Sequence, residues 1–202
     1  MAQARARDLP RLQPVILPAP RQAGGRPLLE VLAQRRSSRE FAPRELDRQL
    51  LSDLLWAAFG INRPDGHRTA PSARNWQEID IYVALSRGLY LFNPGKCRLD
   101  AILDEDIRDL TGMQDFVGTA PLNLVYVADL RRMDAEDRTE QRFYSAVDAG
   151  LIAENVYLFC ASEGLETVVR GLVDRKALAG KMGLRPEQRV IVAQTIGFPQ
   201  QR

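Results

Sequence analysis

The spacing of apolar residues along the chain predicts two substantial helices. From Asp47 to Phe59 apolar residues recur three and four positions apart, which indicates a helix with one buried face, and Gly60 supplies its end. Between about residues 138 and 163 apolar residues surround most of the circumference. We therefore expect this longest helix to be buried in a core or packed in a dimer interface. Shorter helical segments are predicted at 27–36, 105–110, 113–118 and 174–182.

A different spacing predicts strands. Within residues 78–85 the apolar side chains of Ile79, Ile81, Val83 and Leu85 occupy every second position, which predicts a strand, and residues 88–92 are expected to pair beyond it. Residues 122–128 form a continuous apolar run suited to the interior of a sheet, and 166–170 and 188–196 predict two further strands. Because helices and strands follow one another without regular alternation, the expected class is α+β, with a central mixed β-sheet flanked by helices.

The first 26 residues differ from the rest of the chain. They combine arginines with four prolines and end near Gly24-Gly25, a composition that cannot sustain a helix. We expect residues 1–26 to form an extended N-terminal arm along the surface or along a partner subunit, and residues 27–202 to form one domain. A chain of 202 residues that is 45% hydrophobic can bury a core of that size.

Composition narrows the possible functions. With 28 basic and 26 acidic side chains the formal net charge is only +2, so no global positive field marks a nucleic-acid-binding protein. Cys97, Cys160 and the one histidine, His67, supply neither a disulfide framework nor a zinc site, and they leave little room for a Ser-His-Asp hydrolase. Nor does the chain contain a P-loop or a G-x-G-x-x-G motif after a strand. If this protein is an enzyme, we expect a cofactor to carry the chemistry, with no catalytic side chain and no metal.

The sequence also suggests where the protein works. No segment has the apolar length of a membrane span, and residues 1–20 lack the apolar centre of a signal peptide. We expect a cytoplasmic protein that binds neither membrane nor nucleic acid. A leader removed before the first residue would leave no trace in this sequence.

Arginines and serines cluster at the predicted end of the 27–36 helix, in Arg35-Arg36-Ser37-Ser38-Arg39-Glu40-Phe41. Guanidinium groups match phosphate oxygens in pairs, and neighbouring hydroxyls add short hydrogen bonds, so the cluster is typical of a phosphate site. The alternative is an ordinary solvated helix end, because the whole chain is rich in arginine and cations complement the helix dipole.

Two further segments could face a flat ligand. Pro71-Ser72-Ala73-Arg74-Asn75-Trp76-Gln77 lies just before a strand, where the side-chain amides can meet the edge of a heterocycle; the alternative is a polar loop that enters a sheet. Arg170-Gly171-Leu172 lies between a strand and a helix, where a glycine lets a ligand approach the backbone closely. An ordinary turn glycine is the alternative there.

Together the three segments resemble the flavin-dependent nitroreductase family, and within it the branch related to the thiazoline/oxazoline dehydrogenases of peptide-modifying systems. Residues 35–41 are similar to the family's R-x-S-x-R-x-F motif, and residues 68–75 resemble its P-S-x-x-N segment. Residues 88–94 resemble the short G-L-Y hairpin of that branch, 148–155 the start of the central dimer helix, and 197–199 the terminal G-Y-P. The resemblance covers about residues 28 to 199.

The resemblance implies a homodimer of interlocked subunits with two FMN molecules at the interface. Two of the three segments would reach each FMN from one subunit and the third from the other. Family members often continue into a basic tail that completes the phosphate site, whereas this chain ends at Arg202. The implied phosphate contacts are Arg35, Ser37, Arg39 and Arg202, with Arg36 either joining them or stacking nearby. The implied contacts of the ribityl chain and isoalloxazine ring are Pro71, Ser72, Asn75 and Gln77, and those of flavin N5 are Arg170, Gly171 and Leu172.

The function implied is that of an FMN-dependent oxidoreductase. It would transfer two electrons by a ping-pong exchange from NADH or NADPH through the flavin to a small organic acceptor, which residues 62–67 and 101–116 are expected to select. One alternative is a protein of the same fold that senses, stores or processes flavin without nicotinamide-driven turnover. Another is an arginine-rich module that binds an acidic partner or RNA, against which the near-neutral net charge argues.

Overall fold

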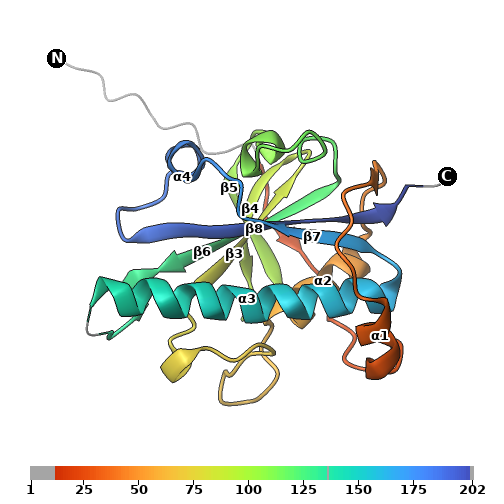
Figure 1. Ribbon diagram of the computed structural model, residues 1–202, viewed down its shortest axis with the longest axis horizontal. Helices are drawn as coiled ribbons and strands as arrows, with labels where there is room; N and C mark the ends of the chain where they lie inside the picture. The colour runs from red at the N-terminus through yellow and green to blue at the C-terminus, as the bar shows by residue number, and fades with distance from the viewer. Residues whose placement is uncertain (1–11, 136, 201–202) are drawn as a thin grey trace.

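The computed structural model describes residues 12–135 and 137–200, and its centre is a β-sheet with helices on both faces (Figure 1). The strands are β1 (Val15–Ile16), β2 (Phe41–Ala42), β3 (Ile79–Leu85), β4 (Gly88–Asn93), β5 (Arg98–Leu103), β6 (Leu122–Asp129), β7 (Glu166–Arg170) and β8 (Gln188–Pro199). The α-helices are α1 (Leu28–Gln34), α2 (Arg48–Phe59), α3 (Arg138–Glu163) and α4 (Arg175–Met182), with short 3₁₀ turns at Ala73–Asn75, Arg108–Thr111 and Leu130–Arg132.

All pairings among the described strands are antiparallel, in the order β1-β5-β4-β3-β6-β8-β2 with β7 also paired to β8. This differs from the mixed sheet expected from the sequence. β6 and β7 are joined by α3 and run in the same direction, as in a β-α-β unit. They do not pair with each other, because β8 lies between them, with Ile196 opposite Leu122 on one side and Thr167 on the other.

The helices divide the core into two layers. α2 and α3 cover one face of the sheet, where Leu54, Ile152 and Val156 are fully buried. α4 covers the other face, where Leu178 and Val125 belong to a second buried apolar cluster. Burial of these apolar side chains from water is the main force that holds the layers together.

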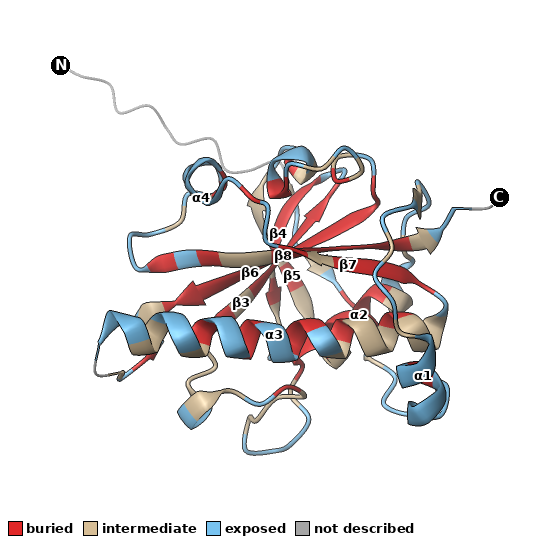
Figure 2. Ribbon diagram, in the orientation of Figure 1, coloured by how far each residue is buried: buried red, intermediate tan, exposed pale blue. Residues whose placement is uncertain are grey.

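The long helix α3 has the bounds predicted from the sequence. The side chain of its N-cap Asp137 accepts hydrogen bonds from the backbone N–H groups of Thr139 and Glu140, and Gly164 ends it in the left-handed conformation (φ 72°). One side of α3 is buried and the other is exposed (Figure 2). On the exposed side Phe143, Val147 and Leu151 follow one another at four-residue spacing. We call these three residues the α3 stripe.

Other elements depart from the sequence prediction. Residues 105–110 and 113–118 contain no α-helix and only the 3₁₀ turn Arg108–Thr111. β5 was not predicted, nor were the two-residue strands β1 and β2. β1 lies within residues 12–26 and pairs with β5, so this part of the chain runs along the sheet edge. None of the helices in the described ranges is long and apolar enough to cross a membrane.

Candidate functional site

A single tyrosine joins two of the three candidate segments. After α1 the chain runs beside β7, where the Ser38 N–H donates to the carbonyl of Thr167 (3.0 Å). The hydroxyl of Tyr157, on α3, lies 2.8 Å from the Ser37 hydroxyl and accepts a hydrogen bond from the backbone N–H of Val169 (2.9 Å). The 35–39 segment and the end of β7 therefore lie side by side in one chain.

The three guanidinium groups of this segment are not equivalent. Arg36 forms an ion pair with Glu166 (2.5 Å), so a carboxylate of the protein already occupies it. Arg35 lies over the ring of Tyr157, 5.4 Å from its centroid. Arg39 is exposed and, like Arg35, forms no ion pair with any described residue. Arg35 and Arg39 thus have no carboxylate that offsets their charge, whereas Glu166 neutralises the charge of Arg36 and engages one of its N–H groups.

At the end of β7 the Arg170 side chain points into the core and is only 3% exposed. Its guanidinium donates to the Thr195 hydroxyl (2.9 Å), the Thr111 carbonyl (2.7 Å) and the Asn123 side-chain oxygen (3.0 Å). Gly112 makes room for it, since a Cβ there would meet the guanidinium at 1.8 Å. Burial without a carboxylate lowers its pKa to about 10. In this conformation Arg170 could meet a cofactor only through its backbone.

Gly171 and Leu172, by contrast, lie on the surface. A Cβ added at Gly171 would meet nothing within 4 Å, so the backbone there is open to a flat ligand. The Leu172 carbonyl accepts a hydrogen bond from the N–H of Met113 (3.2 Å). Both residues are exposed, Leu172 to 55% and Met113 to 65%. Accessible backbone and exposed apolar side chains adjoin at this point.

The second segment, which we call the 71–77 loop, has strained backbone geometry. Arg74, Asn75 and Gln77 have φ angles of 47°, 55° and 48°, a region that costs non-glycine residues on the order of 1–3 kcal/mol each. The Ser72 hydroxyl helps to hold this shape by accepting a hydrogen bond from the Gln77 N–H (3.0 Å). Such strain concentrates at functional sites.

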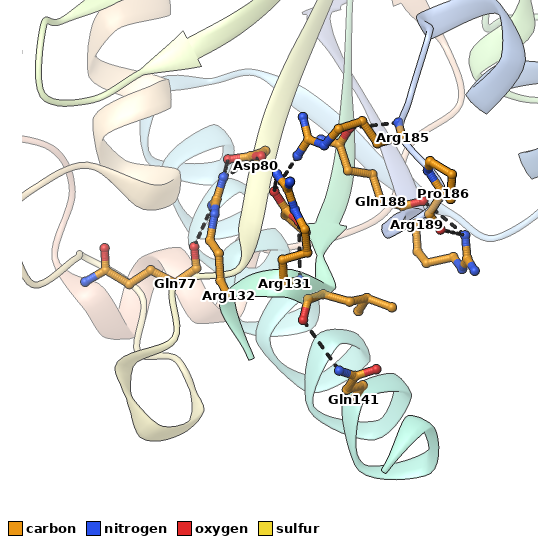
Figure 3. A network of polar contacts seen from close by, with 11 residues as sticks. Gln77, Asp80, Arg131, Arg132, Gln141, Arg185, Pro186, Gln188 and Arg189 are labelled. Carbon is orange, nitrogen blue, oxygen red and sulfur yellow. Dashed lines mark hydrogen bonds and ion pairs between the residues drawn. The ribbon is translucent and has the colours of Figure 1, made fainter. Parts of the chain in front are cut away.

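The Gln77 side-chain amide is already used within the protein. It donates to the Asn75 side-chain oxygen (2.8 Å) and accepts from the guanidinium of Arg68 (2.8 Å). Its backbone carbonyl accepts from Arg132, which also forms an ion pair with Asp80 (Figure 3). Gln77 therefore orients Asn75, and the exposed Asn75 is the better placed of the two amides to meet a ligand.

Beneath this loop lies a pair of buried carboxyl groups that the sequence analysis did not identify. Asp148, on α3, accepts a hydrogen bond from the Ala73 N–H (2.9 Å). The Glu78 side chain faces Asp148 and is fully buried, and neither of its carboxyl oxygens receives a hydrogen bond of normal geometry from the described residues. Burial, aided by the Asp148 carboxyl, raises the pKa of Glu78 to about 7, and burial also raises the pKa of Asp148.

A single chain brings only two of the three segments together. The 35–39 segment and the end of β7 are tied to Tyr157, whereas the 71–77 loop is tied to Asp148, nine residues earlier on α3. An α-helix rises about 1.5 Å and turns about 100° per residue. Asp148 and Tyr157 are therefore roughly 14 Å apart along the axis of α3 and lie on opposite sides of the helix.

Comparisons with known proteins identify relatives of this chain. The sequence model of the nitroreductase family matches residues 32–198. A protein of Methanocaldococcus jannaschii assigned as a nitroreductase is 32% identical over 154 residues, which cover 71% of this chain and 78% of that protein. The crystal structure of a protein from Ralstonia eutropha JMP134, also assigned as a nitroreductase, is 45% identical with a TM-score of 0.90, covering 95% of this chain and 91% of that one.

A more distant structural relative belongs to the Escherichia coli microcin synthetase McbBCD complex. One chain of that complex is 18% identical, with a TM-score of 0.73, and the match covers 83% of this chain and 70% of that one. At this identity the likeness shows a shared fold. The family match spans most of the sequence and the two closer relatives carry the same assignment, so the chain belongs to the nitroreductase family.

Proposed function

We propose that this protein is an FMN-dependent oxidoreductase that transfers two electrons from a reduced nicotinamide nucleotide to a small organic acceptor by a ping-pong exchange. The observation that carries the proposal is the pairing of the 35–39 segment with the end of β7. Arg35 and Arg39 have no carboxylate partner in the described structure. Ser37, which lies between them in sequence, is bonded to the same Tyr157 hydroxyl as Val169, two residues before the open backbone of Gly171. A phosphate and a flat ring system would suit these two regions.

In this proposal each segment has a separate task. Arg35, Ser37 and Arg39 bind the FMN phosphate, with Arg202, which lies outside the described residues, as a further predicted contact. The backbone at Gly171 and Leu172 faces the flavin ring near N5. When bound, the flavin supplies the redox chemistry, so the protein has to position the ring and exclude water. Asn75, oriented by Gln77, meets the ring edge from the 71–77 loop, beside the predicted contacts Pro71 and Ser72.

The geometry of α3 supports a homodimer with shared sites. At about 100° per residue, the α3 stripe lies between the side of the helix that holds the 71–77 loop and the side that holds Tyr157. A second copy packed over the stripe by a two-fold rotation would bring its own 71–77 loop toward the 35–39 segment of the first. The apolar side chains of Phe143, Val147 and Leu151 would then be buried, as is typical of obligate homodimers.

A visible spectrum of the purified protein, followed by anaerobic titration with NADH and with NADPH, tests the proposal. We expect flavin absorbance, or thermal stabilisation by added FMN, and bleaching by at least one of the two nucleotides. A colourless protein that FMN does not stabilise would contradict FMN binding. Bound FMN that neither nucleotide reduces would instead favour a flavin-sensing or flavin-processing role.

A further inference from the structure

A cavity of about 620 Å³ opens between the first half of α3, the start of β8 and the start of α4. Its volume is within the range of small-molecule sites. Val190 and Ile191 of β8 provide an apolar wall. The polar lining is dominated by guanidinium groups from three separate stretches of the chain, namely Arg131, Arg138, Arg142, Arg175 and Arg189.

These positive charges are largely uncompensated. Of these five arginines only Arg131 has an ion-pair partner among the described residues, Asp129 at 3.3 Å. Glu187 is the one carboxylate in the lining. Arg138, Arg142, Arg175 and Arg189 form no ion pair within the described ranges. A concave surface of one charge sign raises the local concentration of ligands of the opposite sign.

Two of the guanidinium groups are held in place by the backbone. Arg175 donates twice to the carbonyl of Ile191 (3.2 and 2.8 Å), and Arg189 donates to the carbonyl of Pro186 (2.6 Å; Figure 3). Because these bonds leave other N–H groups of each guanidinium free, the two side chains are pre-organised to bind an anion.

The cavity adjoins the segment proposed to face the flavin. Arg170, the last residue of β7, pairs with Ala193 of β8. Val190 and Ile191 precede Ala193 on β8, beyond the last pair with β7, and they line the cavity. Arg175 follows Leu172 by three residues, a length of chain that spans at most about 10 Å. A ligand in the cavity could extend to the surface of Gly171 and Leu172.

We infer that this cavity binds a nucleotide that carries more than one phosphate group. Guanidinium groups pair with phosphate oxygens in a bidentate manner and stack on flat rings. Four arginines without an ion-pair partner in the described ranges carry more positive charge than a ligand with a single carboxylate would neutralise, which favours a ligand with several negative charges. The base or sugar contacts the Val190 and Ile191 wall. If the proposed function is correct, this ligand is the reduced nicotinamide nucleotide that donates the electrons. Otherwise it is a separate nucleotide that acts as an effector.

Titration calorimetry on the full-length protein with NADP⁺, NAD⁺, ADP and inorganic pyrophosphate tests the inference without requiring turnover. We expect the nucleotides to bind more tightly than pyrophosphate, and Arg142→Ala and Arg189→Ala each to weaken nucleotide binding about ten-fold, because each removes a charge-assisted hydrogen bond. Arg87→Ala, an exposed arginine on the β3–β4 hairpin that does not line the cavity, should leave the affinity unchanged. If NADP⁺ or NAD⁺ binds more tightly than ADP, the ligand of the cavity is the nicotinamide electron donor. If neither binds more tightly than ADP, the ligand is a nucleotide effector.

The inference is overturned if none of the nucleotides binds, if pyrophosphate binds as tightly as they do, or if Arg142→Ala, Arg142→Gln and Arg189→Ala all retain wild-type affinity. The FMN spectrum of the same preparation is recorded separately. A failure of FMN binding therefore contradicts the proposed function, and a failure of nucleotide binding contradicts only the present inference.

Discussion

The buried pair Glu78 and Asp148 should make the stability of the protein depend on pH in a way that one substitution removes. Glu78 is fully buried against Asp148, whose carboxylate holds the Ala73 N–H at the start of the 71–77 loop. When Glu78 is neutral, its carboxyl group can donate its proton to the Asp148 carboxylate that it faces. When both groups are ionised, two negative charges face each other in a site of low dielectric constant. We predict that Glu78→Gln, whose amide can donate to Asp148 at any pH, removes this repulsion.

The pKa of Glu78 gives the sign and the size of the effect. Its pKa rises from 4.5 in the unfolded chain to about 7 in the folded protein. Below pH 4.5 both states are protonated, and the stabilisation is fully present. Between pH 4.5 and 7 only the unfolded state loses its proton, so the free energy of unfolding falls by about 1.4 kcal/mol per pH unit, or about 3 kcal/mol in total. Above pH 7 both states are ionised and the loss is complete.

Urea unfolding of the wild type and Glu78→Gln at pH 5, 6, 7 and 8, at one protein concentration, measures this difference. We expect the variant to gain stability over the wild type as pH rises, by up to about 3 kcal/mol at pH 8. Asp148→Asn should show the same trend, and Glu30→Gln, at an exposed position on α1, should show none. A difference between Glu78→Gln and the wild type that stays constant from pH 5 to 8 would refute the raised pKa of Glu78.

Four further substitutions test the fold and the site. Arg170→Met should lower the free energy of unfolding in urea by roughly 3 kcal/mol, because it leaves buried acceptors without a donor. Val147→Glu should shift the protein from dimer to monomer in analytical ultracentrifugation and reduce FMN retention at the same time; a monomer that binds FMN as tightly as the wild type would contradict the shared site. Arg39→Ala should weaken FMN binding by at least ten-fold, measured by flavin fluorescence, and more than Arg74→Ala, since Arg74 is already paired with Glu140. Asp137→Ala should destabilise the protein by about 1 kcal/mol, seen as a lower Tm, because the N-cap of α3 is lost.

The elements that could be predicted from the sequence are those whose apolar spacing is undisturbed. α3 and β6 were predicted nearly to the residue, because long periodic or continuous apolar segments leave few alternatives. β5 was missed because Arg98 and Asp100 interrupt its apolar pattern. The structure shows that these two side chains form an ion pair with each other (2.5 Å), so they need not break the strand. Strand direction was beyond the sequence, because it depends on β8 inserting between β6 and β7.

The candidate site divides in the same way. The three segments were identified from local residue patterns, but which of them meet in one chain depends on contacts between residues far apart in sequence. Tyr157 contacts Ser37 across 120 positions, and Asp148 contacts Ala73 across 75. Neither anchor carries a local signal: the first is an aromatic residue and the second an acidic residue in a long helix. For the same reason no local pattern indicated that the Arg170 side chain turns inward or that the Gln77 amide is used within the protein.

In an arginine-rich chain the number of arginines in a segment says little about ligand binding, because the fold assigns them different tasks. Arg170 is buried among neutral acceptors, and Arg36 and Arg132 are paired with carboxylates. Each of these would have to give up a protein contact before it could bind an anion, which costs about as much as the new bond returns. Arg39 and Arg142 have no such cost among the described residues. These two arginines, one beside β7 and the other at the cavity, are therefore where substitution should most clearly separate the binding of the FMN phosphate from the binding of a second phosphorylated ligand.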